Sequence, residues 1–131
     1  MLKLDKSISI TVPQFKNDGG VMAHEVYKRM DDLTKHFGGV TVTQAVGHWF
    51  SDEGIKHVDT NSIYEWNVGN VEDAALSMGR VMLGILSLLN AGEQDAVFFK
   101  LGATAYIYDN SISNLASNDA ENAIEKYLGG F

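Results

Sequence analysis

Segments with the apolar pattern of a strand alternate along the chain with segments that have the apolar pattern of a helix. The order of these segments is the feature that most limits the fold. Ser7–Phe15 alternates apolar and polar residues with period two, which predicts a strand. Val21–Phe37 carries apolar residues at helical spacing and is followed by two glycines, which predicts a helix and its end. Gly39–Val68 predicts a long hairpin that turns at residues 51–54.

The second half repeats this arrangement of strand and helix. Asn70 is the expected N-cap of a second helix that runs to about Asn90, and Ala96–Leu101 is the expected next strand. The order β-α-β-β-α-β is the ferredoxin-like pattern, which predicts an α+β fold with an antiparallel sheet and two helices on one face. The C-terminal additions expected here are a strand at Thr104–Tyr108, a polar loop at Asp109–Ser117 and a short helix capped by Asn118.

Length and composition narrow the class of protein. The 131 residues predict one domain over residues 1–131. The chain has no cysteine and a net charge of −7, with its ten Lys and Arg scattered. This excludes thiolate chemistry and disfavours a nucleic-acid partner, because no basic stripe forms. The longest apolar run, Val81–Leu89, is too short to span a membrane, and no signal segment opens the chain. We therefore expect a cytoplasmic protein without a membrane partner.

The two faces of the predicted sheet differ in character. The residues expected to face the helices are Ile8, Ile10, Val12, Val40, Val42, Val46, Tyr64, Trp66, Val68, Val97, Phe99 and Leu101. The residues expected on the open face are Ser9, Thr11, Thr41, Thr43, Ala45, Gly47, Trp49, Ile63, Glu65, Phe98 and Lys100. An open face of small, β-branched and weakly polar residues is typical of a surface that another subunit covers. We therefore expect a homo-oligomer.

Several polar residues of the hairpin are candidates for chemistry. Glu65 on a covered face needs a cation, which is either Lys100 or the ammonium group of a ligand. His48 and His57 lie on opposite arms and are expected to face each other, but without a well-placed carboxylate they indicate surface histidines rather than a metal site. We expect no metal ion and no organic cofactor.

Two resemblances to known families follow from the hairpin and its surroundings. The run Gly38-Gly39-Val40-Thr41-Val42, continued by Gly47-His48-Trp49 and Ile63-Tyr64-Glu65, resembles the hairpin of small bacterial and phage proteins with a PII-like fold. The order of elements, with Ala74-Ala75-Leu76, Gln94-Asp95-Ala96-Val97 and Thr104-Ala105, is similar to the bacteriophage lyases that degrade S-adenosylmethionine.

The second resemblance implies a function and a site. These lyases form trimers with sites between subunits and use a Tyr near the end of the second strand and a Glu at the start of the third. Here the first position corresponds to His48, Trp49 or Phe50. The second falls near Asp59 to Asn61, where only Asp59 could substitute for the Glu by its chemistry. The resemblance implies a lyase that gives methylthioadenosine and homoserine lactone, in a homo-trimer that binds an adenosyl ligand.

The residues expected at that site are two carboxylates and four ligand contacts. Glu65 and Asp59 are the candidate catalytic residues, and the expected ligand contacts are Gln14, Phe15, Trp49 and Tyr64. Two alternatives stay open. The chain is a non-catalytic PII-like module that binds a nucleotide-type metabolite, or a small acidic inhibitor that acts by contact with a protein.

Overall fold

The computed structural model describes residues 1–109 and 114–130, and only the backbone of residues 114–118. The elements in chain order are β1 (Lys6–Pro13), α1 (His24–Phe37), β2 (Thr41–Phe50), β3 (Lys56–Val68), α2 (Ala74–Leu89), β4 (Ala96–Leu101), β5 (Thr104–Asp109) and α3 (Asn114–Gly129). The predicted α+β class and the ferredoxin-like order of the first six elements are confirmed.

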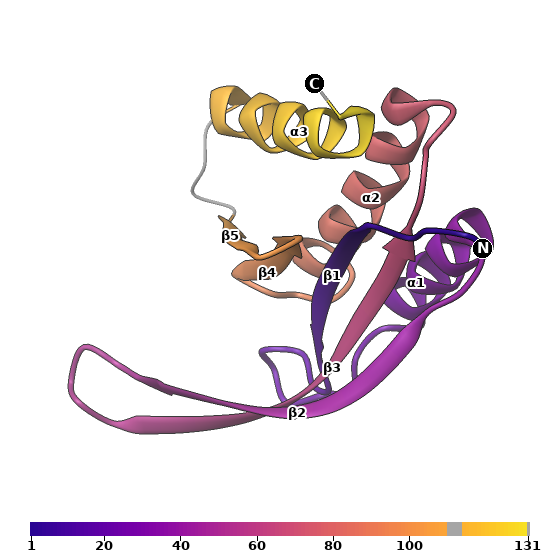
Figure 1. Ribbon diagram of the computed structural model, residues 1–131. Helices are drawn as coiled ribbons and strands as arrows, with labels where there is room; N and C mark the ends of the chain where they lie inside the picture. Colours follow the sequence, from indigo (N-terminus) through magenta and orange to yellow (C-terminus); the bar gives the residue numbers. More distant parts are fainter. Residues whose placement is uncertain (110–113, 131) are drawn as a thin grey trace.

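The five strands form one antiparallel sheet in the order β2-β3-β1-β4-β5. Each crossover through α1 or α2 skips one strand, and right-handed crossovers of this kind place both helices on the same face. Figure 1 shows the helices gathered on one side of the sheet, with α2 between α1 and α3. The hairpin of β2 and β3 extends well beyond this body.

The core lies between the helices and the central strands. Alternate residues of β1, namely Ile8, Ile10 and Val12, are fully buried, as period two requires. β3 and β4 add Trp66, Val68, Val97, Phe99 and Leu101, and the facing residues of α2 include Val81, Ile85 and Leu88. No helix in the described part of the chain has the length and apolarity needed to cross a membrane.

The helix ends explain where the predicted bounds were wrong. Helix α1 begins at His24 rather than Val21, because Val21 forms a β-bridge with Phe15. It ends as predicted at Gly38, whose φ of 100° allows its N–H to bond to the Thr34 carbonyl at 2.8 Å.

Helix α2 is capped by Asp73 and not by Asn70. The Asp73 carboxylate accepts a hydrogen bond from the N–H of Leu76 at 3.0 Å. The negative charge of this carboxylate is also stabilised by the positive end of the helix dipole. Helix α3 is 16 residues long and begins at Asn114, so the prediction of a short helix capped by Asn118 was wrong. Residues 110–113 of the expected polar loop lie outside the described residues.

The hairpin continues past the sheet as a two-stranded arm. β3 pairs with β1 only from Asn61 onward, whereas its pairing with β2 continues to Phe50 and Lys56. The chain reverses at the predicted turn, where Ser51 N–H bonds to the Ile55 carbonyl at 2.9 Å. We call residues 46–60 the distal arm.

Two valines of β2 are more exposed than the alternation predicted. Val42 and Val46 are 44% and 60% exposed, whereas Val40 packs against the core. The sequence nevertheless predicts the correct side of the sheet for these valines, since Val42 pairs with Tyr64 on the face that bears the helices. The helices do not extend far enough to cover the strand beyond Val40.

Candidate functional site

A tryptophan on the distal arm is fixed by two contacts on the face away from the helices. Trp49 lies opposite His57 in the register of β2 and β3, and the two rings stack with centroids 4.2 Å apart and planes 12° from parallel. The Nε1–H of Trp49 donates to Oδ2 of Asp59 at 2.8 Å. Asp59 pairs with Gly47, where an added Cβ would lie 3.2 Å from Nδ2 of Asn61.

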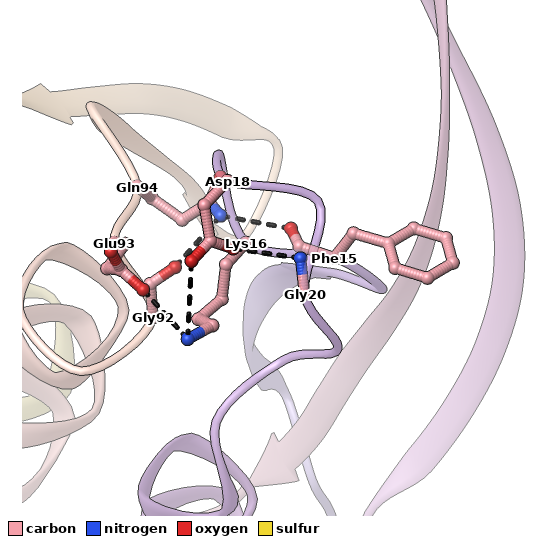
Figure 2. Close-up of polar contacts among 7 residues, drawn as sticks. All are labelled: Phe15, Lys16, Asp18, Gly20, Gly92, Glu93 and Gln94. Carbon is pink, nitrogen blue, oxygen red and sulfur yellow. Dashed lines mark hydrogen bonds and ion pairs between the residues drawn. The ribbon is translucent and has the colours of Figure 1, made fainter.

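The segment after β1 carries a second exposed aromatic ring next to the hairpin. The N–H of Gln14 donates to the Thr60 carbonyl at 3.0 Å, so the pairing with β3 continues past the end of β1. Phe15 follows directly, and its own backbone forms a β-bridge with Val21 rather than with β3. Phe15 is 48% exposed, and Figure 2 shows its ring pointing away from the polar contacts of its own loop. We call Phe15, Trp49, His57 and Asp59 the distal site.

Gln14 lies beside this site, but its position in the strand alternation assigns it to the helix-facing side of the sheet. Its Oε1 accepts a hydrogen bond from the Thr60 hydroxyl at 2.7 Å. The side-chain amide is therefore held close to the arm, with its NH₂ group available as a donor.

Tyr64 is separated from the predicted ligand contact Trp49. It faces the helices, is half-buried and stacks on Trp66 with centroids 6.0 Å apart. Burial raises the pKa of the Tyr64 hydroxyl, and the neighbouring Tyr27 and Asp31 raise it further. The structure thus places Tyr64 on the opposite face of the sheet from Trp49.

Glu65 is also separated from the distal site. It is six residues from Asp59 on β3, which corresponds to about 20 Å at roughly 3.3 Å per residue. Its exposed side chain lines a cavity of about 430 Å³ together with Leu2, Leu4 and Phe37. Within one chain, the two candidate carboxylates therefore cannot bind the same small group.

The pairing of Glu65 with Lys100 that the sequence left open is not formed. Ser9 lies between them, since it pairs with Glu65 on one side and with Lys100 on the other. Two strand spacings of about 4.8 Å separate their backbones. Among the described residues, the ion pairs are formed by Lys16 and Arg29.

The two histidines of the hairpin do not face each other. His48 pairs with Val58, one position along from His57, so their side chains point to opposite faces. No group of three His, Cys, Asp or Glu side chains among the described residues is arranged to hold a metal ion. The stacking role of His57 was not predicted, although a turn at residues 51–54 fixes the register that places it opposite Trp49.

The distal site combines one carboxylate with flat aromatic surfaces. Oδ2 of Asp59 is engaged by the indole, which leaves Oδ1 able to accept a hydrogen bond from a ligand. A carboxylate next to aromatic faces is suited to an organic cation that also carries a planar ring.

Comparison with known proteins agrees with the ferredoxin-like α+β class that the fold defines. No protein-family model and no curated protein matches the sequence. Two solved structures are similar. A phage SAM lyase in complex with S-methyl-5'-thioadenosine has a TM-score of 0.58 and 14% identity, over 83% of this chain and 92% of that chain. A phage SAM lyase in the apo state has a TM-score of 0.59 and 15% identity, over 87% and 98%. The chain is therefore weakly similar to phage SAM lyases, and the likeness is one of fold.

Proposed function

We propose that this protein is a lyase that cleaves S-adenosylmethionine into methylthioadenosine and homoserine lactone. The observation that carries the proposal is the contact between Trp49 and Asp59, which holds a carboxylate and an aromatic plane together on the open face of the sheet. The fold supports it, because a structure of similar fold is a phage SAM lyase in complex with S-methyl-5'-thioadenosine.

The reaction needs little catalytic equipment. The substrate's own carboxylate oxygen attacks its γ-carbon, and the bond from that carbon to the sulfonium sulfur breaks. The electron pair of that bond stays on sulfur, so methylthioadenosine leaves neutral, the lactone ring closes, and no proton is transferred. The protein needs to fold the methionyl chain so that oxygen and carbon approach to about 3–3.5 Å.

Asp59 would keep the methionyl chain of the substrate in this bent conformation. In this proposal its free Oδ1 accepts a hydrogen bond from the α-ammonium group, while the indole fixes the carboxylate through Oδ2. A carboxylate must not stabilise the sulfonium itself too well, since that charge disappears in the transition state. Glu65, about 20 Å along the strand, is the alternative ammonium ligand and would define a different pocket.

The aromatic residues would bind the adenosyl part and exclude water. Phe15 and Trp49 offer exposed rings, at 48% and 50% exposure. Gln14 and Tyr64 both lie on the helix-facing side, so the NH₂ group of Gln14 and the ring of Tyr64 would contact the ligand only through a conformational change or a second subunit.

We further propose that the working unit is a PII-like homo-trimer in the host cytoplasm, with the pocket between subunits. The open face supports this assembly, because Phe98 and Ile107 are 43% and 67% exposed there, and the distal arm has no cover within the protomer. A two-stranded hairpin is marginally stable alone in water, so contact with a neighbouring subunit would stabilise it.

The activity is tested by incubating micromolar protein with S-adenosylmethionine and measuring methylthioadenosine by chromatography. Asp59→Asn is expected to lower turnover by about tenfold or more, since it removes a charge-assisted hydrogen bond. Glu53→Gln, which removes a carboxylate at the tip of the same hairpin, is the matched control. No product above the spontaneous background would reject the lyase. Retention of methylthioadenosine without turnover would identify the binding module instead.

The assignment of the carboxylate is tested separately with Glu65→Gln. If that variant loses activity while Asp59→Asn keeps it, the pocket lies at the Glu65 cavity and the distal site is not the active site. If both variants keep full activity, neither carboxylate holds the ammonium.

A further inference from the structure

The loop that carries Phe15 is held by a second loop, and we propose that Glu93 and Gln94 are positioning residues for Phe15. Both belong to the connection between α2 and β4, far from Phe15 in sequence. The inference rests on the proposed function, in which Phe15 contacts the adenosyl group, and assigns the placement of that ring to residues outside the distal site.

Gln94 contacts the backbone of Phe15 directly. Its Nε2 donates to the Phe15 carbonyl at 3.2 Å and to the Gly92 carbonyl at 3.1 Å, so one amide group joins the two loops (Figure 2). The contact is to the main chain, which leaves the Phe15 ring free to point outward.

An ion pair reinforces this contact at the next residue. Nζ of Lys16 lies 2.8 Å from Oε2 of Glu93 and 3.8 Å from Oδ2 of Asp18. The hydrogen bond that the Lys16 ammonium donates to Glu93 raises the pKa of Lys16, and the charges of Asp18 and Glu93 raise it further. Figure 2 shows Lys16 between the two carboxylates, so consecutive residues 15 and 16 are tied to the same loop.

The other side of Phe15 is tied to the sheet. Gln14 is bonded through its N–H to the Thr60 carbonyl at 3.0 Å, and its own carbonyl accepts from the N–H of Met22 at 3.0 Å. Phe15 itself forms a β-bridge with Val21. The ring is thus placed between one anchor on β3 and a second anchor on the loop after α2.

The loop after α2 is itself closely constrained. Glu93 has a φ of 51°, which is uncommon for a residue other than glycine. Such a conformation persists where the surroundings over-determine it, and it is concentrated at functional sites. The Gln94 N–H bonds to the Leu88 carbonyl at 3.0 Å, which ties the loop to the last turn of the buried helix α2. The second anchor is therefore a fixed support for Phe15.

The first test compares Gln94→Ala with the intact protein by hydrogen exchange, without any ligand. The amides of Lys16, Gly19 and Met22, which are bonded within the Phe15 loop, are expected to exchange several-fold faster. Amides in β1 are expected to be unchanged. Gln44→Ala is the matched control, because Gln44 also joins two segments through its side chain, to Ser62 at 3.1 Å, but away from the Phe15 loop. Unchanged exchange in the Phe15 loop would overturn the inference.

The second test asks whether Gln94 acts through Phe15. By calorimetry, Gln94→Ala is expected to weaken methylthioadenosine binding about 3- to 10-fold, the usual effect of one hydrogen bond. In turnover, KM should rise while kcat is kept. The double variant Phe15→Ala with Gln94→Ala should bind no more weakly than Phe15→Ala alone. Additive losses would show that Gln94 acts independently of the ring and would contradict the positioning role.

The ion pair has its own control in a charge exchange. Lys16→Glu is expected to weaken binding, and Lys16→Glu combined with Glu93→Lys is expected to restore it. If the intact protein binds no methylthioadenosine at all, the proposed function fails, and the exchange rates alone decide whether Gln94 and Glu93 fix the Phe15 loop.

Discussion

The indole Nε1–H of Trp66 donates to the hydroxyl of Thr34 at 3.1 Å, and that hydroxyl in turn donates to the Met30 carbonyl at 2.9 Å. Trp66 is fully buried, so its N–H has no access to water. A single threonine on α1 thus satisfies the polar group of the largest buried side chain of β3. Among the described residues, no buried side-chain nitrogen or oxygen lacks a partner.

Replacing Thr34 by valine should therefore destabilise the fold. The side chain keeps its shape but loses the hydroxyl, which leaves the buried indole N–H unpaired and lowers the free energy of unfolding by about 1–3 kcal/mol. Urea unfolding measures the change. Thr43→Val on the exposed part of β2 is the control and should change stability by less than about 0.5 kcal/mol. Equal stability of the two variants would mean that the Trp66 N–H finds another partner.

Stability should fall on acidification through His36. Nε2 of His36 lies 2.7 Å from the hydroxyl of Ser77, which is 1% exposed. Burial lowers the pKa of the His36 imidazole below its ordinary 6.5, and the nearby Arg80 charge lowers it further. The folded state therefore binds this proton less readily than the unfolded state. The stabilisation from neutral His36 is complete above pH 6.5 and is lost as the pH falls through the lowered pKa.

The measurement is the midpoint of urea unfolding between about pH 8 and pH 5. His36→Gln keeps a polar group for Ser77 but cannot titrate, so the difference between the two proteins isolates His36. We expect the intact protein to lose stability relative to the variant as the pH falls. A difference that does not change with pH would contradict the assignment.

Replacing glycine by alanine is expected to change stability in opposite directions at two positions. A Cβ added at Gly92 would lie 2.6 Å from the Leu88 carbonyl oxygen, so Gly92→Ala must displace the backbone and should cost about 1–3 kcal/mol. A Cβ at Gly79 in α2 meets nothing within 4 Å, and alanine there should stabilise the helix by about 0.5–1 kcal/mol. Thermal unfolding of the two variants checks both signs. Two losses, or two gains, would contradict this account.

Much of the fold could be predicted because short-range patterns determine it. The strand β4 has the predicted bounds, and the hairpin turn lies where Gly54, with a φ of 81°, allows it. The ends of the helices were less predictable. Val21 has the spacing of a helical residue, but its pairing with Phe15 across the loop outweighs that local preference.

The candidate site could be predicted only in part, because its residues depend on where strand pairing stops. Alternation correctly assigns Trp49 and Glu65 to one face, but it carries no information on distance along the strand, and Glu65 lies far from Trp49. The exposure of Val46 has the same origin, since a sequence pattern does not indicate how far the helices extend over the sheet. The support of Phe15 by Gln94 links segments 79 residues apart in sequence, which no local pattern indicates.

A charge on the open face should dissociate the proposed oligomer. Phe98 is 43% exposed on β4, on the face away from the helices, and Phe98→Glu would place a carboxylate in an apolar contact. Light scattering coupled to size exclusion should show a trimer for the intact protein and a mass near 14 kDa for the variant. Leu83→Glu, at an equally exposed position of α2 (47%), is the control and should stay trimeric. A monomeric intact protein would reject the assembly.

Two variants of Trp49 should separate the contribution of its Nε1–H from that of its ring. Trp49→Phe keeps a ring that can stack on His57 but removes the Nε1–H that fixes Asp59, so the KM for S-adenosylmethionine, which carries the ammonium group, should rise by about 2- to 10-fold. Trp49→Ala removes the ring as well. Stacking of a base on an aromatic side chain is worth about 1–3 kcal/mol in single-stranded nucleic-acid sites, so this variant should weaken binding by roughly ten- to a hundredfold. Phe50→Ala, at an adjacent residue that is 67% exposed and points to the other face, is the control and should bind normally. Turnover kinetics measure the effect of Trp49→Phe, and calorimetry with methylthioadenosine measures Trp49→Ala and Phe50→Ala. Unchanged affinity in Trp49→Ala would remove the distal site from the pocket.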